Sequence, residues 1–189
     1  MTPLKMFLTV CLGFLLLLPQ VFLFSEAAKN DSNSEGELIL DFEDETEVNK
    51  LEIENIKNVK LGNQYFGNTH GVLSLMADFV KAEKAFLKYD FSKDDLKFDA
   101  ENFNAILVDI SKYSDGDLNL ILSSHIKAES GEIEVTKKIK LEGKKARTLE
   151  LPLKDKDGNK IKGLILDFSL IAENVEKKAP ITLDYLRLK

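Results

Sequence analysis

Beyond residue 36, short apolar runs alternate with polar residues, and turn-forming residues separate one run from the next. Residues 72–80 are typical, because Leu73, Leu75 and Ala77 alternate there with polar or flexible side chains. About nine such runs recur at intervals of roughly 8–14 residues, and no long amphipathic helix interrupts them. The pattern predicts an all-β fold, an antiparallel β-sandwich or jelly roll. An up-and-down barrel is the alternative, although it would need more even strand lengths.

The first and last runs make two more specific predictions. Residues 37–44 place Leu38, Leu40 and Phe42 on one face of a strand. In the closing run, 179–189, the apolar positions shift by one residue at Asp184. Because such a shift moves every later side chain to the other face, a β-bulge or a change of packing partner is expected near Asp184.

The N-terminus resembles an export signal. Lys5 is the only charged residue before an uncharged run that extends to Phe24, and small residues then suit cleavage after Ala27. We therefore expect a signal peptide at 1–27, a disordered spacer at 28–36 and one domain at 37–189, in a secreted or periplasmic protein. The uncharged run is also nearly long enough to span a bilayer, so an uncleaved N-terminal membrane anchor is the alternative.

Charge and cysteine content exclude several functions. The net charge is −6 with no basic patch, which argues against nucleic-acid binding. The single cysteine, Cys11, lies in the expected signal peptide, so the mature chain would contain no disulfide and no thiol nucleophile. His125 follows two serines, residue types that hydrolases use together as nucleophile and base. The Gly-x-Ser-x-Gly motif of α/β hydrolases is absent, however. We expect no enzymatic activity.

The order of several segments suggests a family. They are Leu-Asp-Phe-Glu-Asp (40–44), Thr-His-Gly-Val-Leu-Ser-Leu (69–75), Phe-Asn-Ala-Ile-Leu-Val-Asp-Ile (103–110), Thr-Leu-Glu-Leu-Pro-Leu (148–153), Ile-Lys-Gly-Leu-Ile-Leu (161–166) and Ile-Thr-Leu-Asp-Tyr-Leu-Arg-Leu (181–188). Together they resemble the galactose-binding-like jelly roll of secreted carbohydrate-binding modules. The resemblance implies a structural Ca²⁺ held by Glu43 or Asp41 and by Asp184, with loop carbonyls near residues 68–71. Oxygen ligands of this kind suit Ca²⁺.

The resemblance also implies a glycan partner, which such modules bind on aromatic side chains. The chain has no Trp, so the candidate ligand-binding residues are Tyr65, Phe66 and Tyr113 in expected loops. The lack of Trp keeps a second hypothesis open: a structural or protein-interaction module of the cell envelope that has no sugar site. A membrane partner is expected only if the N-terminal segment stays uncleaved.

Overall fold

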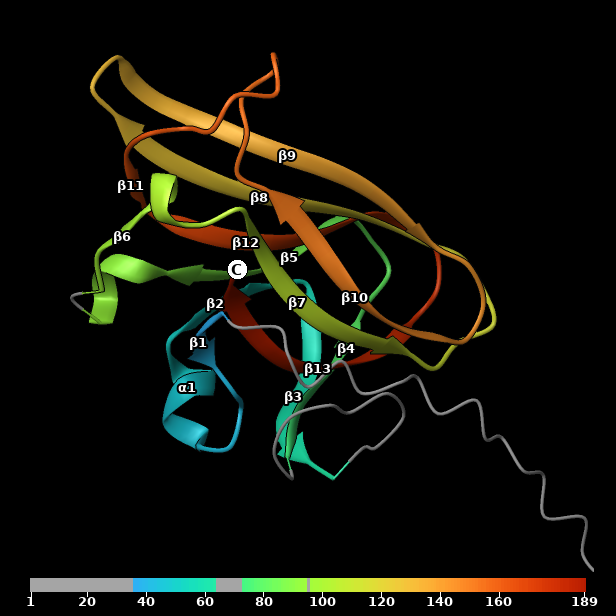
Figure 1. Cartoon of the computed structure of the whole chain (residues 1–189). Coiled ribbons are helices and arrows are strands. Elements are labelled where there is room, and N and C mark those ends of the chain that lie inside the picture. The colour runs from blue at the N-terminus through green and yellow to red at the C-terminus, as the bar shows by residue number, and fades with distance from the viewer. Residues whose placement is uncertain (1–35, 64–72, 95) are drawn as a thin grey trace, which may run out of the picture. The chain divides into compact units, whose positions relative to one another are not determined.

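The computed structural model describes residues 36–63, 73–94 and 96–189, which form two antiparallel β-sheets packed face to face (Figure 1). The β-sandwich prediction is therefore confirmed, and the alternative barrel is wrong. The expected signal peptide and nearly all of the expected spacer lie outside the described residues. Among the residues described, no helix has the length and apolar character needed to cross a membrane.

Sheet A has one long central strand, β13, between β7 and β4. In spatial order its strands are β10 (Lys145–Pro152), β7 (Ala105–Lys112), β13 (Ala179–Leu188), β4 (Ser74–Phe79) and β3 (Ile56–Gly62), with β1 (Glu37–Leu40) beside the C-terminal half of β13. The first and last strands of the domain are thus direct neighbours.

Sheet B lies opposite and contains the other strands of the described residues. In spatial order these are β2 (Leu51–Glu54), β5 (Ala82–Asp90), β12 (Asp167–Val175), β8 (Leu118–Ala128), β11 (Leu164–Ile165) and β6 (Phe98–Asp99), with β9 (Gly131–Leu141) paired to β8. The described helices are short: α1 (Glu45–Asn49) and two 3₁₀ turns, η1 (Phe91–Asp94) and η2 (Ala100–Asn102).

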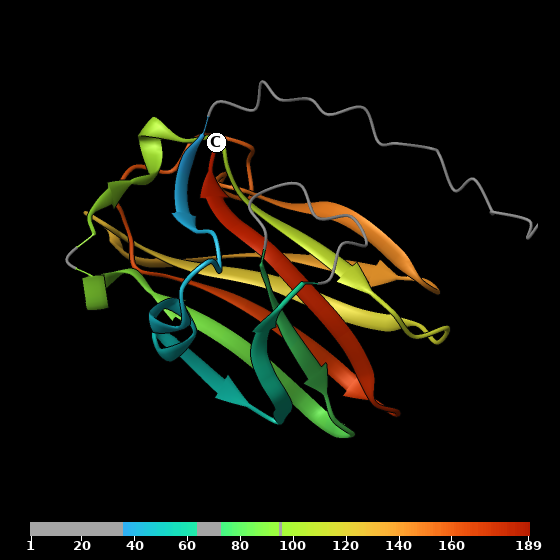
Figure 2. The same cartoon turned by 90° about the horizontal axis from the view of Figure 1, so that it is seen from below.

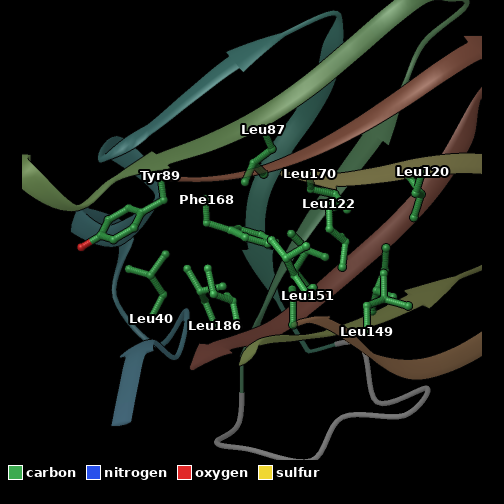
Figure 3. Close-up of a cluster of buried hydrophobic side chains, with 14 of the residues drawn as sticks. Leu40, Leu87, Tyr89, Leu120, Leu122, Leu149, Leu151, Phe168, Leu170 and Leu186 are labelled. Atoms are coloured by element: carbon green, nitrogen blue, oxygen red, sulfur yellow. The ribbon is translucent and has the colours of Figure 1, made fainter. Parts of the chain in front are cut away.

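The hydrophobic core fills the space between the sheets. Leu122, Phe168 and Leu170 point inward from sheet B toward Leu151 and Leu186 of sheet A (Figure 3). All five side chains are at most 3% exposed. Since alternate residues of each strand enter this core, the remaining alternate residues form an outer face on each sheet.

The predicted irregularity in the closing strand is present. The pairing of β13 with β7 shifts between Leu183 and Leu186, so that two residues of β13, Asp184 and Tyr185, stand opposite one residue of β7. This bulge allows Leu183 and Leu186 to enter the same core even though they are three positions apart. Figure 2 shows β13, the red strand, crossing the sheet between its neighbours.

The prediction for the first strand is wrong at Leu38. Leu40 and Phe42 are buried, but Leu38 is 39% exposed. The pairing of β1 with β13 is irregular between Leu38 and Leu40, and Leu38 stands opposite Arg187 instead of entering the core. A simple alternation cannot reveal such an irregularity.

Candidate functional site

A groove of about 540 Å³ lies on the outer face of sheet A, over β3, β4 and the first half of β13. Its lining residues come from four separate parts of the chain: Asn58, Val59, Lys60, Met76, Ala77, Asp78, Tyr113, Pro180, Ile181 and Thr182. The volume is within the range usual for sites that bind small molecules.

Sheet pairing brings these residues together. Met76 of β4 stands directly between Lys60 of β3 and Thr182 of β13, and Thr182 is in turn opposite Ser111 of β7. Side chains opposite one another in neighbouring strands share a face of the sheet. A row of mixed polar and apolar groups therefore crosses the outer face of sheet A.

At one end of the groove, Asp78 holds a bulge of the edge strand in place. The pairing of β3 with β4 shifts between Lys57 and Lys60, and Asn58 within this bulge has a φ of 54°. Asn is among the few residues that adopt this left-handed conformation readily. The Asn58 amide donates to Asp78 Oδ2 at 2.6 Å, and Lys178 Nζ lies 2.7 Å from the same oxygen.

These contacts keep Asp78 ionised. Burial opposes ionisation, but hydrogen bonds from Lys178 and Asn58, together with the charge of Lys178, hold the pKa of Asp78 below its ordinary value. The groove thus contains a fixed carboxylate whose charge is already offset by Lys178.

Tyr113 forms part of the groove's wall. It follows the last residue of β7, and its backbone N–H donates to the Pro180 carbonyl at 3.1 Å. The Tyr113 hydroxyl lies 3.1 Å from Thr182 Oγ1. Of the three predicted ligand-binding residues, the structure places Tyr113 at the groove, whereas Tyr65 and Phe66 lie outside the described residues. The assignment of all three to a ligand remains a prediction.

The predicted calcium ligands come from two segments next to each other in sheet A. After β1, Phe42 turns the chain with a φ of 56°, and Asp41 Oδ1 accepts the N–H of Glu43 at 3.1 Å. Glu43 Oε1 accepts the backbone N–H of Leu73 at 2.7 Å. Asp184 occupies the bulge of β13, two residues before Leu186, which pairs with the last residue of β1.

An acid that the sequence interpretation did not select, Glu47, belongs to the same region. Its Oε2 accepts the N–H of Phe42 at 2.6 Å. Burial, and then the negative charge of Asp41, raise the pKa of Glu47 above its ordinary value. The described side chains do not include three or more His, Cys, Asp or Glu residues grouped as a metal site. The loop carbonyls near 68–71 lie outside the described residues, so the calcium site remains a prediction.

His125 lies far from the groove, on the outer face of sheet B, in an ion-paired network. Its Nδ1 is 2.9 Å from the carboxylate of Asp167, which also pairs with Lys88 at 2.8 Å. The neighbouring hydroxyls have other partners: Ser123 Oγ donates to Glu134, and Ser124 Oγ donates to the Asp167 carbonyl. Within the described part of the chain, neither serine is positioned as a nucleophile activated by His125.

The sequence interpretation missed most of the groove. Asn58, Lys60, Asp78 and Thr182 are ordinary polar residues in strands, and no motif marks them. The outward orientation of Asp78 follows from the alternation of β4, but the proximity of all four residues depends on the order of the strands in sheet A. That order is not visible in the sequence.

Comparison with known proteins supports the fold. No protein-family description matches the sequence, and no curated protein does either. Among solved structures, the domain is similar to part of an exo-β-agarase, with a TM-score of 0.62 and 13% identity over 81% of this chain. The match covers 24% of the agarase, so this chain corresponds to about a quarter of that enzyme's length.

Two smaller proteins are matched over nearly their whole length. One is the carbohydrate-binding module CBM28, specific for non-crystalline cellulose, with a TM-score of 0.58 and 15% identity over 82% of this chain and 95% of that one. The other is a family 11 carbohydrate-binding module from Clostridium thermocellum, solved with a β-1,3-1,4-mixed-linked tetrasaccharide. Its TM-score is 0.52, with 16% identity over 81% of this chain and 94% of that one. At these identities the comparison shows the fold: a galactose-binding-like jelly roll, as in carbohydrate-binding modules.

Proposed function

We propose that this domain is a non-catalytic carbohydrate-binding module that binds a glycan in the groove of sheet A. The observation that carries the proposal is the composition of that groove. Tyr113, Pro180 and Met76 offer apolar surface, while Asn58 and Thr182 offer hydrogen-bonding groups. A pyranose ring needs both, because its C–H faces pack on apolar groups and its hydroxyls require partners. The two modules matched over nearly their whole length support the proposal.

The test is glycan binding by matched Tyr113 variants, measured by titration calorimetry against a panel of soluble polysaccharides. Tyr113→Ala removes the ring and should weaken binding about two- to tenfold, the usual contribution of an aromatic contact. Tyr113→Phe keeps the ring and loses only the hydroxyl near Thr182, so most of the affinity should remain. If no glycan in the panel binds the unaltered chain, the proposal is wrong.

A specific observation keeps a second function in view. The chain contains no Trp, although a flat aromatic surface is the usual platform for a sugar ring. A structural or protein-interaction module of the cell envelope would not need one. This alternative predicts that the unaltered chain binds no glycan and that a cell-envelope protein binds it with an affinity that Tyr113→Ala does not change.

We also propose a structural Ca²⁺ held by Asp41, Glu43 and Asp184. The donors present fit this ion, because they are carboxylates and Ca²⁺ prefers oxygen ligands. A cation would also relieve the repulsion between Asp41 and Glu47, which contributes to the raised pKa of Glu47. The ion would join the two ends of the domain where β1 meets β13.

Thermal unfolding with and without a chelator tests the calcium proposal. At an ion concentration about a hundred times the Kd, binding adds about 2.7 kcal/mol to the free energy of unfolding. Chelation should therefore lower the Tm by several degrees. Asp184→Ala should abolish this response, whereas Asp157→Ala in an exposed turn should not. A Tm that is unchanged by the chelator in the unaltered chain would refute the site.

The export proposal concerns residues 1–27. We propose that they direct the chain to the periplasm or cell exterior and are removed after Ala27, or remain as a membrane anchor. Intact-mass measurement of the protein recovered from cell fractions distinguishes these outcomes. Recovery of the complete chain from the cytosol would contradict both.

A further inference from the structure

The groove of sheet A is flanked by more lysines than carboxylates, although the chain as a whole has a net charge of −6. Lys60 lines the groove, and Lys57 stands directly opposite Asp78 on the same face. Lys178 reaches Asp78 from the segment before β13. Three lysines, Lys57, Lys60 and Lys178, therefore lie at or beside a groove whose one lining carboxylate among the described residues is that of Asp78.

The charge of Asp78 is already satisfied by its own partners. Lys178 and the Asn58 amide both contact Asp78 Oδ2, at 2.7 and 2.6 Å. Lys57 and Lys60, in contrast, form no ion pair with any residue in the described part of the chain. Several lysines elsewhere on the domain do, as Lys140 does with Asp117 at 2.7 Å.

The two lysines without ion pairs are spaced along one side of the groove. Lys57 and Lys60 pair with Asp78 and Met76, which are two residues apart on β4. At about 3.3 Å per strand residue, the two positions on β3 are separated by about 7 Å. Both lysines are exposed, because β3 is the edge strand of sheet A. They can therefore contact anionic groups at two points along an extended ligand.

We infer that the groove selects an acidic glycan, one that carries carboxylate or sulfate groups within reach of Lys57 and Lys60. This inference rests on the proposed glycan-binding function. It specifies the class of ligand: the apolar wall and hydrogen-bonding groups hold the sugar rings, while the two ammonium groups favour the charged form over the neutral one.

The experiment compares glycans that share a backbone and differ in charge. The pairs are polygalacturonate with its fully methyl-esterified form, and a sulfated galactan with its desulfated form. Titrations use the complete chain at low salt. We expect the acidic member of at least one pair to bind more tightly than its neutral member. A preference in the polygalacturonate pair identifies carboxylate as the bound group, and a preference in the galactan pair identifies sulfate. The preference should shrink near 1 M salt, where the Debye length falls to about 3 Å.

Variants of Lys57 and Lys60 test whether these two lysines cause the preference for acidic glycans. Each exposed ion pair contributes about two- to fivefold in affinity, so the double variant Lys57→Gln, Lys60→Gln should lose about four- to twenty-five-fold toward the acidic glycan. Its affinity for the neutral partner should fall by a smaller factor, because Gln removes the charge and keeps a polar side chain at both positions. Lys127→Gln is the matched control, because Lys127 is an exposed lysine on the outer face of sheet B. Unchanged Tm values show that the variants fold.

The possible results distinguish a failure of this inference from a failure of the proposed function. Equal binding of acidic and neutral glycans would overturn the inference and leave glycan binding intact. A preference for acidic glycans that survives in the double variant would also overturn it, because Lys57 and Lys60 would then not be the source of the selection. Failure of every glycan to bind would overturn the proposed function, and this inference with it.

Discussion

Lys112 offers the sharpest test of how the fold supports the groove. It is the last residue of β7, and its side chain is fully buried. Its ammonium donates to the Ser114 carbonyl at 2.6 Å and also to the Gly116 carbonyl. Burial lowers the pKa of Lys112, although the charges of Asp117 and Asp115 oppose this shift. These bonds close the turn that begins at Tyr113.

We predict that Lys112→Met destabilises the domain by about 2 kcal/mol. Hydrogen bonds to a charged group contribute about 1.5–3 kcal/mol each, and two carbonyls lose their donor. Removing the charge also removes the penalty for burying it, which offsets part of the loss. Met fills most of the same volume, so packing should change little. For a domain of this size the Tm should fall by about 4–8 °C.

Thermal and denaturant unfolding measure this effect, with Lys145→Met as the control. Lys145 stands directly opposite Lys112 in β10 but is exposed, so its replacement should leave the Tm unchanged. Because the turn positions Tyr113, Lys112→Met should also weaken glycan binding. A Lys112→Met variant as stable as the unaltered chain would refute the argument that the buried ammonium stabilises this turn.

Two further variants test other parts of the domain. Asp78→Asn should lower stability at pH 7 by about 1–2 kcal/mol. Because the folded pKa of Asp78 lies below 3.8, its contribution is full above that pH and is lost as the pH falls through the folded value. Unfolding should be measured as a function of pH for Asp78→Asn and the unaltered chain. The difference between their free energies of unfolding should narrow below pH 3.8, and a constant difference would contradict this reasoning. Gly163→Ala should destabilise by about 2 kcal/mol or more, because Gly163 has a φ of 142° and an added Cβ would lie 2.4 Å from the Lys127 carbonyl oxygen. Gly116→Ala, where an added Cβ meets no atom within 4 Å, is its control, and equal Tm values for the two variants would contradict the steric argument.

Local patterns predicted the secondary structure because the alternation of apolar and polar residues in a strand shows which of its faces is buried. The alternation in β4 correctly predicted that Leu75 and Ala77 are buried. Turn-forming residues were expected between the apolar runs, and Ser130-Gly131 lies at the hairpin that joins β8 to β9. Both features depend on residues adjacent in sequence, and neither requires knowledge of the partner strand in the sandwich.

Features that depend on the partner strand could not be predicted in this way. Lys112 ends an apolar strand and would ordinarily be assigned to the surface, yet the turn after β7 encloses its ammonium. Leu38 was expected in the core, but the irregular pairing with β13 turns it outward. The groove itself exists because β13 is inserted between β7 and β4, which brings Thr182 beside both Met76 and Ser111.

The bulge in β13 could be predicted from the sequence, but its effect on the surface could not. The shift in phase at Asp184 is visible in the sequence, and it exists because both halves of the strand must supply side chains to one core. Its effect on the outer face is visible only in the structure. Before the bulge, Pro180 and Thr182 line the groove. After it, Arg187 lies over the ring of Tyr185 at 3.9 Å from the ring centroid. One inserted residue thus separates the proposed glycan site from a differently packed surface on the same strand. The same insertion places Asp184 at the boundary between the two surfaces, where the calcium proposal requires a ligand.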